Sequence, residues 1–321
     1  MTVTQVSLGS ALARARARAP GAVIFVVALL VVALLVVATE QEAHAQACCV
    51  GASGLTPGWL ANHERFLVGA QLRVAQTHGT YPLRGDFYQA LPARDSRLEQ
   101  SLFGTVRLLP RAQIGFVAPM TTLRRRSGNL VETKTNIGDV TFIGRYDILR
   151  PGESRIPGIA ILAGGTVPTG TPSDETQGYL ATDVTGIGAW EGNAGLSLEQ
   201  SYGGLILHAT ALVGARTSRD VAGVPQTLGL RALYLLGAGW VFDNDVTLFG
   251  TLTHTSEGDA TIDGVTGYGT GFRTTQLAFL VVTPLSDTVR LRTSLFTDVP
   301  PLGDNRTALG GTSISLLKSW Y

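Results

Sequence analysis

A histidine and a serine stand two positions apart in the segment LTHTSEGD, residues 252–259, and an acid follows them. Serine and histidine side chains act as nucleophile and general base in many hydrolases, where a third group orients the imidazole. His254 and Ser256 are therefore a candidate catalytic pair. Whether they can act depends on the element that carries them and on the face to which they point.

The segments around this pair alternate apolar and polar residues with the period of two that is typical of β-strands. In 65–77, apolar side chains such as Phe66 and Leu72 share one face, and polar side chains share the other. The segments 140–148, 227–242 and 288–296 alternate in the same way. One face of each predicted strand therefore tolerates charge, and the other does not.

The connections between the predicted strands alternate in length. Short turns lie at 109–112, 150–155, 202–204, 243–245 and 284–287, and long polar loops lie near 82–96, 127–136, 171–184, 217–226, 257–269 and 299–309. A secreted soluble sandwich would also alternate in polarity, but regular short and long connections favour a barrel in an outer membrane. The sequence predicts an all-β, up-and-down antiparallel transmembrane β-barrel of about twelve strands over residues 65–321.

The N-terminal region predicts export. Arginines precede an apolar run at 21–38, and small-residue cleavage sites follow at Ala45 and Ala47. We expect residues 1–47 to be a cleaved signal peptide, 48–64 to be a periplasmic N-terminal segment, and the chain to reach the outer membrane of a Gram-negative bacterium. The alternative is a retained membrane anchor. Cys48 and Cys49 are adjacent and close no useful loop, which leaves lipidation, a vicinal disulfide or free thiols.

Net charge and residue spacing argue against nucleic acid and metal ions as ligands. The 321 residues carry a net charge of +1, which provides no basic surface for nucleic acid. His208 has no second histidine, cysteine or carboxylate at ligand spacing, so neither a metal site nor another cofactor is expected.

Face assignment by alternation predicts which charged side chains line the lumen. They are Arg73, Glu99, Arg107, Asp139, Arg145, Asp147, Glu191, Glu199, Arg231, Arg290 and Arg292. Such charges either hold water in an open pore or pair across strands and fill a narrow barrel, and about twelve strands allow both. The apolar inward positions Phe103, Leu233, Leu235, Phe249 and Phe296 favour apolar solutes.

Short motifs lie at the ends of the predicted strands between residues 97 and 200. They are Ala118-Pro119 with downstream arginines, Ile137-Gly138-Asp139, Val167-Pro168-Thr169-Gly170, and Gly186-Ile187-Gly188-Ala189-Trp190. This part of the chain resembles the outer-membrane channel family named for the meta-pathway of phenol degradation. The resemblance implies passage of small aromatic or other hydrophobic compounds.

Two polar features fall at predicted strand ends. Arg124–Arg126 precede an external loop, where they form a solvated strand end, contact anionic lipopolysaccharide or gather anionic solutes. His254 and Ser256 fall on the lipid-facing side, where they resemble the His-x-Ser of outer-membrane phospholipase A. That family continues with Asn-Gly where this chain has Glu257-Gly258, and no Asn or Asp on the next strand clearly orients the histidine.

The sequence therefore predicts a non-enzymatic channel or transporter for small, hydrophobic or aromatic molecules. An outer-membrane lipid hydrolase using Ser256 and His254 is one alternative, and a non-conducting structural or adhesive barrel is another. The expected partners are outer-membrane lipids and lipopolysaccharide, a small-molecule solute, and the barrel-assembly machinery, which recognises an aromatic end such as Trp320-Tyr321.

Overall fold

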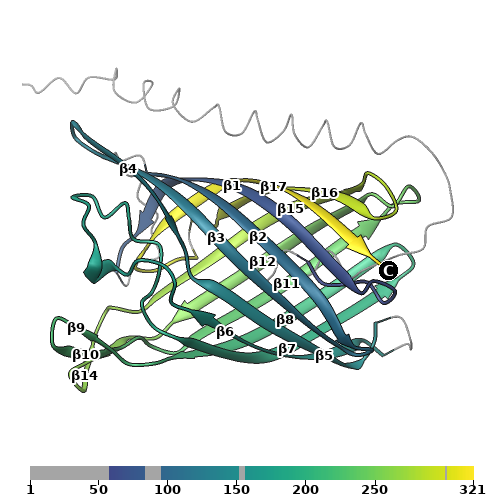
Figure 1. Cartoon of the computed structure of the whole chain (residues 1–321), viewed down its shortest axis with the longest axis horizontal. Coiled ribbons are helices and arrows are strands. Elements are labelled where there is room, and N and C mark those ends of the chain that lie inside the picture. The colour runs from purple at the N-terminus through teal and green to yellow at the C-terminus, as the bar shows by residue number, and fades with distance from the viewer. Residues whose placement is uncertain (1–57, 84–94, 152–155, 301) are drawn as a thin grey trace, which may run out of the picture. The chain divides into compact units, whose positions relative to one another are not determined.

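A computed structural model of the chain describes residues 58–83, 95–151, 156–300 and 302–321 (Figure 1). The expected signal peptide, 1–47, lies outside the described residues, as do Cys48 and Cys49. Among the residues described, no helix is long and apolar enough to cross a membrane.

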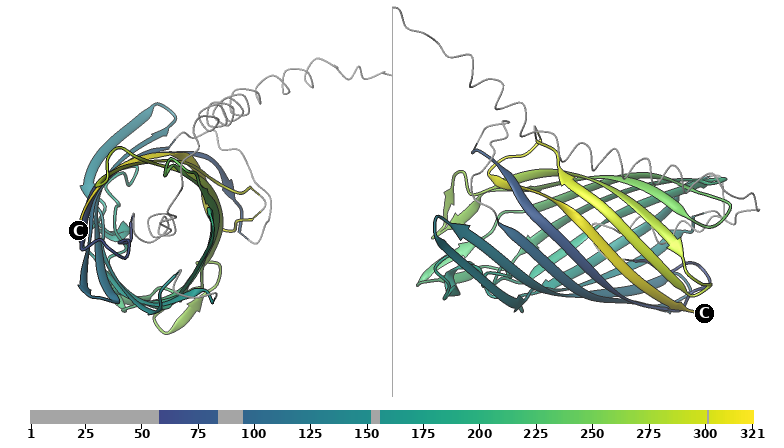
Figure 2. Two further views of the ribbon diagram at one scale, coloured as in Figure 1. Left: turned by 90° about the vertical axis from the view of Figure 1, so that its right-hand side faces the viewer. Right: turned by 90° about the horizontal axis from the view of Figure 1, so that it is seen from above.

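Twelve antiparallel strands close into a barrel, which is seen end on in Figure 2. The strands are β1 (Phe66–Tyr81), β2 (Ser96–Leu109), β3 (Ala112–Ser127), β5 (Val140–Leu149), β6 (Gly158–Val167), β7 (Glu191–Tyr202), β8 (Leu205–Arg216), β11 (Arg231–Val241), β12 (Thr247–Glu257), β15 (Phe272–Pro284), β16 (Val289–Asp298) and β17 (Arg306–Trp320). Each pairs with the next, and β17 pairs with β1 from Phe66↔Trp320 to Tyr81↔Arg306. Closure leaves the barrel without an unpaired edge, and it confirms the predicted fold class.

The long connections contain short elements of their own at one end of the barrel (Figure 1). Strand β4 (Leu130–Ile137) extends β3 as a hairpin. Strands β9 (Arg219–Val221), β10 (Val224–Thr227), β13 (Ala260–Ile262) and β14 (Val265–Gly267) form a separate four-stranded sheet, and η3 (Ser173–Glu175) is a 3-10 turn. The sequence predicts only polar loops there. We call this the long-loop end and the opposite end the short-turn end.

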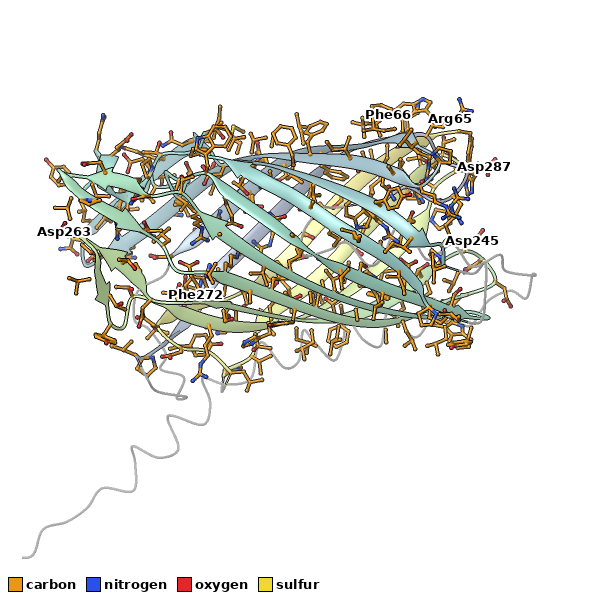
Figure 3. The ribbon with its side chains drawn as sticks, turned by 90° about the horizontal axis from the view of Figure 1, so that it is seen from below. Arg65, Phe66, Asp245, Asp263, Phe272 and Asp287 are labelled. Carbon is orange, nitrogen blue, oxygen red and sulfur yellow. The ribbon has the colours of Figure 1, made fainter. Side chains whose placement is uncertain are left out.

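Alternation along each strand separates an apolar outer surface from the barrel interior. On β1, Phe66 and Leu72 point outward and are each 40% exposed, whereas Leu67 is 0% exposed and points inward. The ring of Phe66 lies tilted beside that of Trp320 at the short-turn end, with 5.2 Å between ring centroids. Figure 3 shows Phe66, Asp245 and Asp287 at that end and Asp263 at the other. The polar and charged side chains of the strands therefore gather inside the barrel, where any pathway must lie.

Candidate functional site

The barrel interior contains a cavity of about 350 Å³, which we call the main cavity. Its charged lining residues are Arg73, Arg97, Glu99, Arg231, Arg292, Asp298 and Arg306. Its other lining residues are mainly hydroxyl-bearing, such as Thr251, and apolar, such as Leu233 and Phe296. Arg73, Glu99, Arg231 and Arg292 belong to the set that the sequence predicts for the lumen, whereas Arg97, Asp298 and Arg306 do not.

The carboxylate of Glu99 in the main cavity forms ion pairs with two arginines. Glu99 Oε2 lies 3.3 Å from Arg97 and 3.9 Å from Arg73. The guanidinium of Arg73 also lies over the ring of Phe296, 4.1 Å from its centroid. The side chains of Arg73, Arg97 and Glu99 are 25%, 38% and 20% exposed, so these charges remain accessible from the cavity.

A second charged cluster lies toward the long-loop end. Arg216 donates to Glu191 and to Glu257, each at 2.8 Å, and Arg231 lies 3.6 Å from Glu191. A smaller cavity of about 130 Å³ is lined by Glu191 and shares Arg231 and Leu233 with the main cavity. Glu191 and Arg231 are expected in the lumen from the sequence, whereas Arg216 and Glu257 are not. Glu257 falls in the predicted loop at 257–269, and Arg216 stands at the last position before the predicted loop at 217–226.

A third charged cluster fills the barrel nearer the short-turn end. Arg145 donates to Asp147 at 2.7 Å and lies 3.7 Å from Glu199, and His208 Nδ1 lies 4.0 Å from Glu199. None of these side chains is more than 6% exposed. Among the described residues, no group of three or more metal-ligating side chains is placed to hold an ion. Arg145 and Asp147 pair along β5, and Arg145 and Glu199 pair across strands, so these charges fill part of the interior. Glu199 and His208 also line a separate cavity of about 590 Å³.

The segment 58–64 also occupies the interior. Trp59, Leu60 and Ala61 are 3%, 2% and 0% exposed. Trp59 packs against inward-facing residues of β5, β6, β8 and β11, and it lies 5.8 Å from the guanidinium of Arg145. The sequence predicts a periplasmic segment over 48–64, whereas its described part packs inside the barrel.

Two of the arginines predicted to line the lumen bind this segment. Arg107 donates to the carbonyl oxygens of Ala61 and Glu64 at 2.7 and 2.9 Å. Arg290 forms an ion pair with the side chain of Glu64. Glu64 and Arg290 border another cavity, of about 460 Å³, at the short-turn end. The segment 58–64 therefore shares a buried cluster with Leu233 of the main cavity through Trp59 and borders the end cavity through Glu64.

Asp139 organises the long loop between β6 and β7. Its carboxylate accepts the N–H groups of Gly170 and Ile187 at 2.9 and 2.8 Å, and the hydroxyl of Thr169 donates to the carbonyl oxygen of Gly138 at 2.7 Å. These contacts join the motifs at 137–139, 167–170 and 186–190. Asp139 is expected in the lumen from the sequence, but it is not among the residues that line the main cavity.

The three consecutive arginines have different environments. Arg125 pairs with Asp95 at 3.3 Å and donates to the carbonyl oxygen of Leu180 at 2.8 Å. Arg126 donates to the carbonyl oxygen of Gly128, and Arg124 is exposed at the end of β3. Arg125 therefore links the connection that ends at Asp95 to the loop between β6 and β7 at the long-loop end.

His254 and Ser256 point outward on β12, toward its long-loop end. His254 Nδ1 lies 2.9 Å from the hydroxyl of Thr275 on β15, which is a partner that the sequence analysis did not find. Within the described part of the chain, no hydrogen bond joins His254 to Ser256. A threonine hydroxyl can orient an imidazole ring, but it lacks the charge that stabilises an imidazolium in a catalytic triad.

Comparisons with known proteins bear on the fold. No family model matches the sequence, and no curated protein matches it. The COG4313 outer membrane channel from Pseudomonas putida F1 is 13% identical with a TM-score of 0.68, and the alignment covers 80% of this chain and 96% of that one. The translocator domain of the autotransporter NalP from Neisseria meningitidis is 10% identical with a TM-score of 0.44, covering 84% and 92% of the two chains. The first similarity is one of fold, and the second is too weak to bear on function. The resemblance to the phenol-degradation channels stays a prediction.

Proposed function

We propose that the protein is an outer-membrane channel for small, hydrophobic or aromatic molecules. The observation that carries the proposal is the main cavity, a charged and hydroxyl-lined space inside a closed barrel whose outer face is apolar. Leu102, Leu236 and Leu316 on that outer face are 63%, 59% and 51% exposed. Apolar side chains at this density are favourable in a bilayer, and a polar interior holds water for solutes.

The aromatic preference is supported by the apolar part of the lining. Phe296 and Leu233 are 7% and 6% exposed, and Leu280 is 2% exposed. These side chains offer a surface against which a ring can pack while its polar groups face the arginines and threonines. The segment 58–64 and the cluster around Arg145 fill the interior nearer the short-turn end, which favours small solutes over bulky ones.

Liposome swelling tests both parts of the proposal. Phenyl glucoside and glucose are the probes, because the glucoside is the larger molecule and differs by its aromatic ring. A channel with aromatic preference admits phenyl glucoside faster, whereas a pore that selects only by size admits glucose faster. If neither solute enters, and planar bilayers containing the folded protein show no conductance, the chain is a non-conducting barrel and the proposal is wrong.

The contact between His254 and Thr275 supports a second candidate, a lipid hydrolase at the outer rim of the barrel. Ser256 stands two residues along on the same outward face. The neutral threonine and the lack of a His254–Ser256 hydrogen bond among the described residues make us favour the channel. Incubation with phospholipid vesicles decides between them. Release of fatty acid by the native protein, abolished in Ser256→Ala, would establish the hydrolase.

A further inference from the structure

We infer that the main cavity binds a small anion with an apolar body, such as an aromatic carboxylate or sulfonate. This inference rests on the proposed channel function and assigns a charge to its solute.

Positive charge dominates the cavity wall. Among the described residues that line it, five are arginines and two are carboxylates, which is an excess of three positive charges. The outer face of the barrel is apolar, and charges inside a narrow passage with low-dielectric walls interact with a solute more strongly than they would in bulk water. An anion entering this cavity is therefore attracted, and a cation is repelled.

The carboxylates of the wall do not cancel this excess. Glu99 is shared between Arg73 and Arg97. Asp298 accepts the side-chain amide of Gln276 at 3.1 Å with one oxygen and the N–H of Leu309 at 2.8 Å with the other. Arg231 and Arg306 also interact with carboxylates of the neighbouring cluster, since Glu191 lies 3.6 Å from Arg231 and Glu257 acts electrostatically on Arg306. Arginines still outnumber carboxylates in the described wall when these two are set aside.

The same wall has hydrogen-bonding capacity that the described residues leave unused. The Nε of Arg97 and the hydroxyl of Thr274 are buried and have no hydrogen-bond partner among the described residues. Guanidinium groups bind carboxylate, sulfonate and phosphate oxygens through paired N–H groups, and they form stronger hydrogen bonds to charged acceptors than to neutral ones. An anionic head group therefore fits this wall better than a neutral polar group does.

Apolar side chains lie where the body of such a solute would rest. The ring of Phe296 lies beneath Arg73, at 4.1 Å from its guanidinium carbon, and Leu280 is another lining residue. A solute whose charged group contacts Arg73 therefore has an apolar surface within reach of its ring. The volume of about 350 Å³ lies at the small end of the range for ligand pockets, roughly 300–1,000 Å³. A single ring with one anionic group suits this space.

Binding of benzoate and benzamide to the full chain in detergent, measured by isothermal titration calorimetry, tests the inference. The two probes have the same shape and differ in charge. We expect benzoate to bind more tightly, and Arg73→Gln to weaken benzoate binding about tenfold or more while leaving benzamide unchanged. Arg124→Gln, at an exposed arginine of β3, is the matched control and should bind benzoate like the native chain. Equal affinities for the two probes would overturn the inference.

The charge selectivity of the native chain tests the inference without any variant that could fail to fold. In planar bilayers under a potassium chloride gradient, the reversal potential should indicate preference for chloride, and liposomes should admit benzenesulfonate faster than benzyltrimethylammonium. Preference for the cation overturns the inference but leaves the channel standing. Benzoate binding that depends on Arg73, in a protein without conductance or flux, supports the site and overturns the channel function.

Discussion

Replacing Trp59 by alanine should both destabilise the barrel and widen its lumen. The indole is 3% exposed, packs in a buried cluster with Leu162, Leu212 and Leu235, and lies 5.8 Å from the guanidinium of Arg145. Removing a fully packed aromatic side chain costs about 3–5 kcal/mol, because its apolar contacts are lost and the cavity relaxes only in part. Because the indole occupies the barrel interior, the space that it leaves should also ease ion flow.

The assay pairs two readouts on one variant. The free energy of unfolding comes from urea titration of the refolded protein, followed by far-ultraviolet circular dichroism, and the conductance comes from single-channel recording. Trp240→Ala is the control, because Trp240 points outward and is 49% exposed. We expect Trp59→Ala to unfold more easily than the control and to conduct more. If the two variants match in both stability and conductance, Trp59 does not occupy the lumen as the structure describes.

Two further predictions concern the external loops. Gly170→Ala should speed cleavage of the loop before β7 by proteinase K, because the added Cβ would lie 2.7 Å from the backbone of Gly186, whereas Gly192→Ala, whose Cβ meets nothing within 4 Å, should leave digestion unchanged. Hydrogen bonds from the Thr176 hydroxyl and then from the Gln177 N–H lower the pKa of Asp183 below its ordinary 3.8. The stabilising effect of its ionised carboxylate is therefore complete above that ordinary pKa and is lost as the pH falls toward the lowered one. Pepsin should cleave the loop before β7 of the native protein faster as the pH falls below 3.8. The Asp183→Asn variant lacks the ionised carboxylate at every pH, so its loop should already be cleaved above pH 3.8 and its cleavage should depend less on pH.

The strands and their faces could be predicted from the sequence because each strand separates water from lipid. A period of two along Phe66–Val74 specifies which side chains meet the bilayer, and the alternating loop lengths specify the topology. The hairpins within the loops could not be predicted, since β9, β10, β13 and β14 have only three or four residues each. Segments that short carry no reliable alternation.

The segment 58–64 was not recognised as an interior element because its contacts are remote in sequence. Leu60 donates its N–H to Gln113 at 2.9 Å across 53 positions, and Glu64 pairs with Arg290 from near the other end of the chain. Nothing in the local sequence indicates these partners. The segment lacks the periodicity of a strand or a helix, so only the closed barrel specifies where it lies.

The charged residues of the interior could be assigned to a face but not to a role. Alternation places Arg73 and Arg145 on the same side of the wall, yet Arg73 borders a cavity and Arg145 is sealed among its partners. Whether an inward-facing arginine borders a cavity or is buried depends on the side chains that other strands place beside it. Arg216 and Glu257 were within reach of the same rule, because they continue the inward-facing positions of β8 and β12 by one further step. Applying the alternation to the last residue of each strand would have found them.

Single-channel recording of the refolded native protein in planar bilayers shows whether this barrel conducts. We expect discrete openings of small conductance with preference for anions, reduced when benzoate is added because the solute occupies the main cavity. Resistance to detergent unfolding on an unheated gel establishes that the inserted protein is folded. If folded protein gives no current above baseline, this barrel is not a channel.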